Sequence, residues 1–335
     1  MIDLRNRSML AIKDFSKEEI LYLLDLASDF KKKKKEGEDQ RYLLGKNMVL
    51  IFEKTSTRTR ASFEIAGFDL GMGVTYLNKE DSQMSKKESI EDTATVLGRY
   101  YDAIGYRGYD QKLVEDLAKY SKIPVYNALT DLWHPTQMLT EMLTIRENFG
   151  RLEGLNFVYT GDGRNNMANS LAITCAKLGI NFTILAPESL WPSDEIKDMA
   201  RDFAKESGSR VDFSEDIDQT LKDADIIYTD AWVSMGEDES VWDSRIEALY
   251  PYQVNSEFME KAKDTTIFMH CLPAFHDMNT EMGRKIAEKF EGRYDFRGGI
   301  EVTDEVFRSG RSVVFDETAN RIPTMKALLY ATLKE

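Results

Sequence analysis

The sequence MVLIFEKTSTRTRASFEIAGFDL, residues 48–70, contains the pattern that decides the fold. Its first five residues are apolar and predict a buried strand, and residues 61–70 predict a helix. A turn of hydroxyl residues and arginines, residues 56–60, separates the two. Unpaired N–H groups at a helix N-terminus attract anions, and Arg58 and Arg60 add donors suited to phosphate or carboxylate. A simple surface turn would need only the hydroxyl cap, so we predict an oxyanion or phosphate site.

Strand and helix patterns alternate along the rest of the chain in two series. The predicted strands are residues 48–52, 74–77, 103–106, 125–128, 156–160, 182–186, 210–213, 226–229 and 266–269. The predicted helices begin with one capped by Ser16 and Glu19 and continue with residues 61–70, 90–101, 112–120, 134–149, 166–177, 194–206, 217–222, 256–263 and 321–333. Such alternation is typical of βαβ crossovers and parallel sheets.

We therefore predict an α/β protein with two doubly wound domains, each a mostly parallel sheet flanked by helices. The first domain comprises residues 1–150 together with a C-terminal helix, residues 320–335, that returns to it. The second comprises residues 151–319. In such folds ligands bind beyond the carboxyl ends of the strands, which is where each motif described below lies.

Composition excludes several classes of function. The chain has 335 residues, of which 42% are apolar, and a net charge of -14. An acidic protein is not attracted to nucleic acid or to an anionic membrane, so we expect neither as a partner. Cys175 and Cys271 lie far apart, and neither a membrane-length apolar run nor a signal-peptide pattern is seen. We therefore expect a cytoplasmic protein without a disulfide.

Two further motifs of the first series carry polar side chains. In DLWHPTQ, residues 131–137, His134 and Gln137 are three residues apart and project from one helix face. An imidazole beside an amide suits a planar group with both C=O and NH2, although a helix cap and a solvated glutamine remain the structural alternative. Arg107 ends a predicted strand and Arg321 begins the last helix. Each is a surface residue by default, but both are candidates for further anion donors.

The second series has polar residues after three of its strands. In GDGRNN, residues 161–166, Asn166 stands where a dinucleotide-binding loop has its third glycine. Its amide is instead a donor for a carboxylate. Asp230 follows another strand and is a candidate to hold an ammonium group, with a loop cap as the alternative. Cys271 is a nucleophile, a metal ligand or a packing residue, and zinc is disfavoured because only His270 lies nearby at ligand spacing. The proline that follows Leu272 leaves its carbonyl as an acceptor.

Together these motifs resemble the transcarbamoylase family, in the family's order and over nearly the whole chain. The matching stretches are STRTR (56–60), HPTQ (134–137), GDGRNN (161–166), DAWVSMG (230–236) and HCLP (270–273). The last two are similar to members that act on ornithine, whereas an aspartate-specific member is expected to carry His-Pro-Leu-Pro and a basic pair. A putrescine-specific member is expected to lack Ser-Met-Gly. The resemblance implies transfer of the carbamoyl group of carbamoyl phosphate to the side-chain amine of L-ornithine, giving citrulline and phosphate in arginine metabolism.

The resemblance also implies a role for each site residue. Phosphate would be bound by Ser56, Thr57, Arg58, Thr59 and Arg107. The carbamoyl oxygen would accept from His134 and Arg321, and the carbamoyl NH2 would donate to Gln137 and to the Leu272 carbonyl. Asn166 and the Met235 N–H would bind the ornithine carboxylate, and Asp230 and Ser234 its α-ammonium, with Cys271 near the attacking amine. Arg107, His134, Cys271 and Arg321 are the implied catalytic residues, without a metal or cofactor. A homotrimer is implied as well, in which the segment around Gln83 and Lys86 reaches a neighbour's site.

Two alternatives come from other classes of function. A nicotinamide-dependent oxidoreductase is suggested by the βαβ series and the glycines at 161 and 163, but the third glycine and a ribose-binding acid are missing. A non-catalytic binding protein is the other alternative, although both substrate signatures are complete. Within the family, enzymes for aspartate or putrescine are the nearest competitors.

Overall fold

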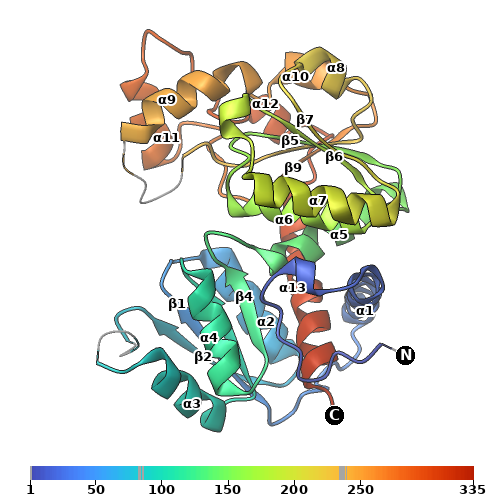
Figure 1. The fold of residues 1–335 in the computed structure, drawn as a ribbon, viewed down its shortest axis with the longest axis vertical. Coiled ribbons are helices and arrows are strands. Elements are labelled where there is room, and N and C mark those ends of the chain that lie inside the picture. Colours follow the sequence, from blue (N-terminus) through green and yellow to red (C-terminus); the bar gives the residue numbers. More distant parts are fainter. Residues whose placement is uncertain (1, 82–83, 85–86, 234–237, 239) are drawn as a thin grey trace. The chain divides into compact units, whose positions relative to one another are not determined.

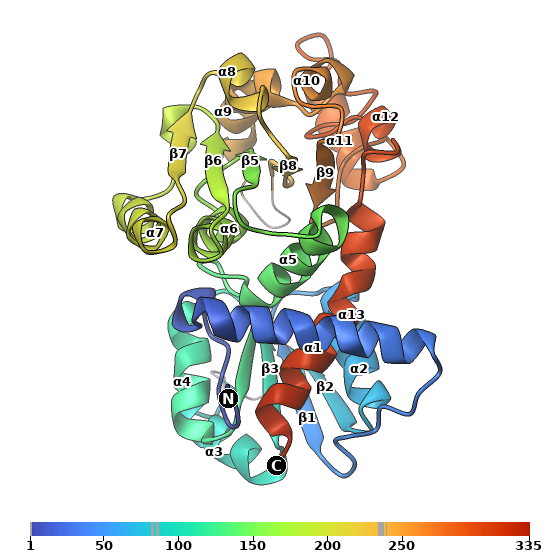
Figure 2. The same cartoon turned by 90° about the vertical axis from the view of Figure 1, so that its right-hand side faces the viewer.

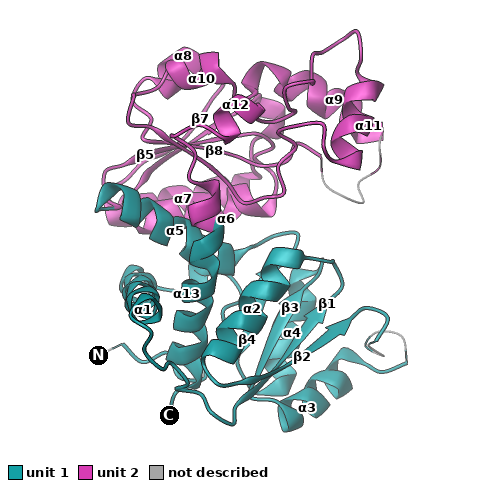
Figure 3. Cartoon of the chain, turned by 180° about the vertical axis from the view of Figure 1, so that it is seen from behind, with its two compact units in different colours: residues 1–151, 318–335 teal, residues 152–317 magenta. Residues whose placement is uncertain are grey.

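The computed structural model describes residues 2–81, 84, 87–233, 238 and 240–335, and within them the strands form two separate parallel sheets (Figures 1 and 2). The chain divides into two compact units (Figure 3). Unit 1 comprises Met1–Arg151 and Thr318–Glu335, and unit 2 comprises Leu152–Glu317. Each unit is a parallel sheet flanked by helices, which confirms the predicted fold class.

The sheet of unit 1 has the strand order β2-β1-β3-β4. Its strands are β1 (Asn47–Phe52), β2 (Gly73–Asn78), β3 (Ala103–Arg107) and β4 (Val125–Leu129). The chain leaves β1 toward β2 on one side and then returns to β3 on the other, so the strand order reverses between β1 and β3. The carboxyl ends at such a reversal form the usual ligand site of an open α/β sheet.

Helices cover both faces of this sheet. They are α1 (Lys17–Lys35), α2 (Thr57–Asp69), α3 (Ile90–Tyr100), α4 (Gln111–Ser121), α5 (Pro135–Phe149) and part of α13 (Val314–Leu333), with a short 3-10 turn η1 (Ile12–Asp14). Val49 and Ile51 alternate along β1 and pack in one cluster with α3 and α4. On the opposite face Phe63 of α2 stacks on Tyr126 of β4, with their ring centroids 6.3 Å apart.

The C-terminal helix α13 packs on unit 1, as predicted. Thr332 bonds to the Tyr126 hydroxyl at 2.6 Å, and Thr324 bonds to Thr140 of α5 at 3.1 Å. The helix begins at Val314 rather than at residue 321 and carries Pro323 in its interior. Proline is common in the first turn of a helix, so Pro323 gives no sign that more than two helical turns precede it.

The sheet of unit 2 has the strand order β7-β6-β5-β8-β9. Its strands are β5 (Asn156–Thr160), β6 (Asn181–Leu185), β7 (Val211–Ser214), β8 (Ile226–Thr229) and β9 (Ile267–His270). Here the strand order reverses between β5 and β8, so the two motifs that follow these strands lie at the second reversal point.

The helices of unit 2 include three that the sequence patterns did not predict. The helices are α6 (Asn166–Lys177), α7 (Asp194–Ser207), α8 (Ile217–Leu221), α9 (Ser240–Leu249), α10 (Ser256–Glu260), α11 (Glu281–Lys289) and α12 (Asp304–Phe307), with 3-10 turns η2 (Glu188–Leu190) and η3 (Tyr250–Tyr252). Besides α9 and α11, the short helix α12 was also not predicted, so three of these helices are absent from the sequence-based prediction. Val158, Ile227 and Phe268 pack on one face of the sheet against α8, α10 and α12. None of the helices in the described ranges is both long and apolar enough to span a membrane.

Candidate active site

The N-terminus of α2 forms the predicted anion turn of unit 1. The helix begins at Thr57, and Ser56 is its N-cap, accepting a 3.2 Å hydrogen bond from the Thr59 N–H. Thr57, Arg58 and Thr59 therefore form the first helical turn, whereas the sequence patterns predicted a helix starting at residue 61. The turn lies directly after β1, at the point where the strand order reverses, so its N–H groups are placed where an anion binds.

Only one of the two arginines in this turn remains a candidate anion donor. The Arg60 Nε donates to Glu64 at 2.9 Å, and the guanidinium lies over the Tyr76 ring at 3.7 Å from its centroid. Arg60, which the sequence pattern counted among the donors of this turn, is therefore already engaged by Glu64 and Tyr76. Arg58 is half-buried one position into the helix.

Three predicted residues from distant parts of the sequence meet near this turn. Arg321 of α13 is 4% exposed, and its Nη2 donates to the Thr59 hydroxyl at 3.1 Å. His134, the N-cap residue of α5, is buried. Its pKa is held well below 6.5, first by burial and then by the positive charges of Arg321 and Arg107. His134 is therefore a neutral imidazole within reach of the charges of two guanidinium groups, which makes the cluster an electropositive site for an oxyanion.

Gln137 lies one turn further along α5 and is 1% exposed. Its amide Nε2 donates to the Glu141 carboxylate at 2.7 Å. Glu141, which is fully buried, was not predicted as a site residue, because its position four residues later reads as ordinary helix sequence.

In unit 2, Asp230 and Cys271 are in direct contact at the ends of neighbouring strands. The Cys271 Sγ donates to Asp230 Oδ1 at 3.3 Å, and the Ala231 N–H donates to the same oxygen at 2.8 Å. The other carboxylate oxygen has a longer 3.5 Å contact with the Asn165 amide. Burial raises the pKa of Asp230 above its ordinary 3.8, although nearby His270 opposes the shift.

The loop between β5 and α6 lies beside this pair. Asn165 is the N-cap of α6 and accepts from the Ala168 N–H at 2.9 Å, while Asn166 begins the helix and is half-buried. Gly161 has φ +138°, a conformation that L side chains rarely adopt, and a Cβ at Gly163 would lie 2.8 Å from the Leu190 carbonyl. Both glycines are therefore explained by backbone geometry and packing rather than by a dinucleotide.

The segment after β9 is held by two buried glutamates that the sequence did not reveal. The Leu272 N–H donates to His270 Nδ1 at 2.9 Å, and His270 Nε2 lies 3.3 Å from Glu301. Glu317 accepts from the His270 N–H at 3.2 Å. These contacts hold Leu272 at φ +56°, which is uncommon for a residue other than glycine. No local signal marks either glutamate, because they lie 31 and 47 residues away from His270 in sequence.

A metal is not required by this arrangement. Ligand atoms of Asp230, His270 and Cys271 lie within 4.8 Å of one another. Both ring nitrogens of His270 are already engaged, one by Leu272 and one by Glu301. A metal here would have to displace one of those bonds.

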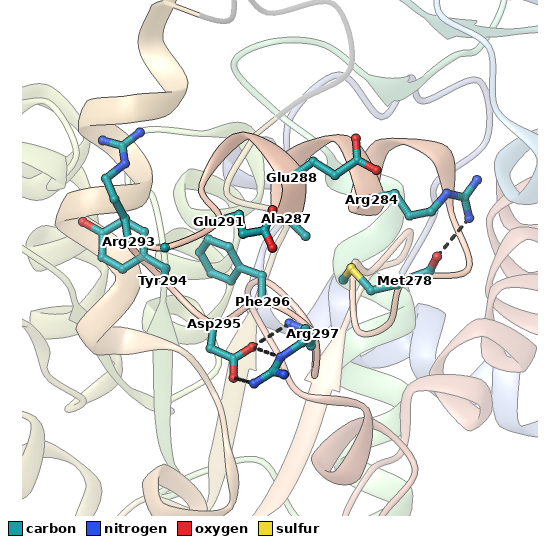
Figure 4. A pocket seen from close by; sticks show the side chains of 11 residues that line it. Met278, Arg284, Ala287, Glu288, Glu291, Arg293, Tyr294, Asp295, Phe296 and Arg297 are labelled. Atoms are coloured by element: carbon teal, nitrogen blue, oxygen red, sulfur yellow. Dashed lines mark hydrogen bonds and ion pairs between the residues drawn. The ribbon is translucent and has the colours of Figure 1, made fainter.

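Four predicted residues lie outside the described ranges: Gln83, Lys86, Ser234 and Met235. A separate surface depression of about 570 Å³ lies along α11 and the loop that follows it (Figure 4). Arg297 pairs there with Asp295 at 2.6 Å, and Arg284 donates to the Met278 carbonyl at 2.9 Å. The depression contains none of the predicted site residues, and its arginines are matched in number by acidic residues, so we assign it no ligand.

Comparison with known proteins gives one consistent result for both units. The model of the aspartate/ornithine carbamoyltransferase carbamoyl-P binding domain matches residues 7–147, and that of the Asp/Orn binding domain matches residues 153–332. A catabolic ornithine carbamoyltransferase of Treponema denticola is 56% identical over 331 residues, covering 99% of this chain and 96% of the relative. A catabolic ornithine carbamoyltransferase of Streptococcus pyogenes serotype M1 is 54% identical, with 98% and 96% covered. The structure of the ornithine carbamoyltransferase of Pyrococcus furiosus is similar with a TM-score of 0.90 at 42% identity, with 99% of each chain covered.

Proposed function

The chain belongs to the aspartate/ornithine carbamoyltransferase family, and from this premise we propose how its two units carry the reaction. The reaction is transfer of the carbamoyl group of carbamoyl phosphate to the side-chain amine of L-ornithine, which gives L-citrulline and phosphate. The observation that carries this conclusion is the identity of 56% over 99% of the chain to a relative named for that activity.

Unit 1 is the proposed carbamoyl phosphate domain. The phosphate binds at the N-terminus of α2, where Ser56, Thr57, Arg58 and Thr59 surround the first-turn N–H groups, and Arg107 adds a second guanidinium from the end of β3. The support for this placement is the position of α2 directly after β1, at the reversal of strand order. A helix N-terminus with a bidentate guanidinium is a strong phosphate site.

The carbamoyl oxygen accepts hydrogen bonds from His134 and Arg321. Attack by the amine places negative charge on this oxygen, and each aligned donor in a desolvated site contributes about 3–4 kcal/mol to transition-state stabilisation. The low pKa of His134 fits this role, because a neutral imidazole remains a donor without adding a third cation. No covalent intermediate is needed, since the enzyme orients two reactants and stabilises an oxyanion.

Unit 2 is the proposed ornithine domain. Asp230 binds the α-ammonium group and Asn166 donates to the α-carboxylate. Asp230 is half-buried, and its second carboxylate oxygen has a 3.5 Å contact with Asn165 among the described residues; both observations support this assignment. Ser234 and the Met235 N–H, which lie outside the described residues, are proposed to complete the binding of the ammonium and the carboxylate.

The attacking amine must lose a proton before it reacts. An alkyl amine with a pKa near ~10.4 is neutral in only about one molecule in a thousand at pH 7, which costs roughly 4–5 kcal/mol. Cys271, hydrogen bonded to Asp230, is proposed to lie beside this amine, and the Leu272 carbonyl is proposed to accept from the carbamoyl NH2. The departing phosphate is the proposed acceptor of the proton released after attack.

We further propose a cytoplasmic homotrimer with shared sites. In this proposal Gln83, outside the described residues, comes from a neighbouring subunit and binds carbamoyl phosphate. Neither Cys175 nor Cys271 forms a disulfide, which is consistent with a reducing compartment.

The activity is tested by supplying the purified protein with carbamoyl phosphate and L-ornithine and measuring citrulline and phosphate together. The expected result is equal molar release of both products. Phosphate released without citrulline would identify a hydrolase and would contradict the proposal.

A further inference from the structure

Gln137 and Glu141 form a buried pair that the proposed reaction uses only in part. They lie one turn apart on α5, with exposures of 1% and 0%. The Gln137 Nε2 donates to Glu141 Oε1 at 2.7 Å. Every residue of α5 from Pro135 to Ile145 is buried, so the pair does not lie at a solvated surface.

The chemistry of the two side chains fixes the direction of this bond. Glu141 accepts this bond from the Gln137 NH2, whereas the glutamine amide could present either its NH2 or its carbonyl edge. Glu141 therefore requires Gln137 to turn its NH2 edge inward. The carbonyl oxygen of the same amide must then point the opposite way.

A carbamoyl NH2 group is a donor only, so it needs that carbonyl edge. We propose that Glu141 is a positioning residue, which fixes the Gln137 amide so that its oxygen accepts from the carbamoyl NH2 and favours it over a methyl group of the same size. This inference rests on the proposed function, in which Gln137 contacts that NH2. In Glu141→Gln the partner side chain can donate as well as accept, so the Gln137 amide is also allowed its reversed orientation, in which its NH2 edge repels the carbamoyl NH2 and tolerates a methyl.

The test compares two stable ligands that differ only at this position. Phosphonoacetamide carries an NH2 group where acetonylphosphonate carries a methyl, and calorimetry gives the dissociation constant of each. The wild-type protein should bind the amide at least about tenfold more tightly, which corresponds to one hydrogen bond to a buried acceptor. In Glu141→Gln this preference should fall about tenfold, chiefly through weaker binding of the amide.

Two further variants separate positioning from structural support. Glu147→Gln makes the same chemical change on the same helix, at a partly exposed residue that pairs with Lys31 at 2.8 Å, and should keep the preference. Glu141→Asp retains the carboxylate and should also keep it, even if both ligands bind less tightly. If Glu141→Gln does not fold, the ligand preference of Glu141→Asp decides whether the Glu141 carboxylate positions Gln137.

Several results would overturn the inference. The first is a wild-type protein that shows no preference for the amide ligand. The second is a folded Glu141→Gln variant that keeps the preference or binds both ligands equally less tightly. The third is a Glu141→Asp variant that loses the preference. Binding is measured without turnover, so a wild-type protein that prefers the amide but forms no citrulline would refute the proposed function and leave the role of Glu141 standing.

Discussion

Replacing Asp230 with asparagine removes one negative charge from unit 2 while keeping the shape of the side chain. The remaining amide oxygen still accepts from the Ala231 N–H, which lies 2.8 Å from the carboxylate in the native protein. What is lost is the ionic partner proposed for the ornithine α-ammonium. We therefore expect a steep rise in the KM for ornithine and little change in carbamoyl phosphate binding.

The magnitude follows from the burial of this carboxylate. Loss of one partner from a desolvated, hydrogen-bonded charge pair costs about 2–4 kcal/mol, which corresponds to a roughly 30- to 1,000-fold rise in KM. Burial also raises the pKa of Asp230 above 3.8, so folding disfavours its ionised form. This cost to stability sets in as the pH rises above 3.8, and Asp230→Asn should accordingly be more stable than the wild-type protein at pH 7. In the wild-type protein, ornithine binding should weaken on acidification from a higher pH than an ordinary aspartate would give.

The assay is citrulline formation against ornithine concentration, with phosphonoacetamide binding and the thermal unfolding midpoint measured on the same samples. Asp225→Asn is the matched control. Asp225 lies at the opposite end of β8, is buried, and pairs with Lys263 at 2.8 Å. That variant should lose stability and keep the native KM. An unchanged KM for ornithine in Asp230→Asn would refute the assignment of the ammonium to Asp230.

Three other predictions concern unit 1 and the assembly. Arg58→Ala should lower kcat/KM for carbamoyl phosphate by roughly 30-fold or more, because the proposed bidentate phosphate contact is lost. Arg60→Ala is the control and should stay near the native value, because the Arg60 guanidinium pairs with Glu64. Similar values for both variants would contradict this prediction. In the folded protein His134 should stay neutral as the pH falls below 6.5, whereas in the unfolded chain it takes up a proton there. This uptake favours the unfolded state, so the free energy of unfolding should decrease as the pH falls below 6.5. An NMR titration, with the His134 signal assigned by means of His134→Asn, that shows an inflection at or above pH 6.5 would disprove this prediction. Mixed and reassembled Arg58→Ala and Gln83→Ala subunits should regain activity above either parent, and mixtures that never do so would show that sites are not shared.

Much of the fold could be predicted because both units obey simple rules. Alternating apolar strands and helices specify parallel sheets, and polar motifs that follow the strands mark their carboxyl ends. The resemblance to the transcarbamoylase family, rather than local pattern, brought Arg321, His134 and Thr59 into one prediction, although they belong to α13, the N-cap of α5 and α2. Strand boundaries were predicted within a residue or two, which is the normal uncertainty of such limits.

The errors have two causes, a local helix cap that was overlooked and contacts from residues far along the chain. The hydroxyl residues after Ser56 have modest helix propensity, so the start of α2 was placed at residue 61, yet the cap at Ser56 begins the helix at Thr57. Arg60 was counted among the general anion donors of the turn, whereas the structure pairs it with Glu64 one turn along α2 and with the Tyr76 ring on β2. Glu301 and Glu317 were missed because a buried acid that orients a backbone segment from far along the chain leaves no sequence pattern.

The choice of amine acceptor tests the central claim most directly. The wild-type protein is supplied with carbamoyl phosphate and equal concentrations of ornithine, putrescine and aspartate in separate reactions, and the initial rates of the carbamoylated products are compared. Ornithine should exceed putrescine by roughly 100-fold or more, because putrescine leaves a buried carboxylate without its ammonium partner, and aspartate should give no measurable product. Equal turnover of putrescine, or faster turnover of aspartate, would contradict the account.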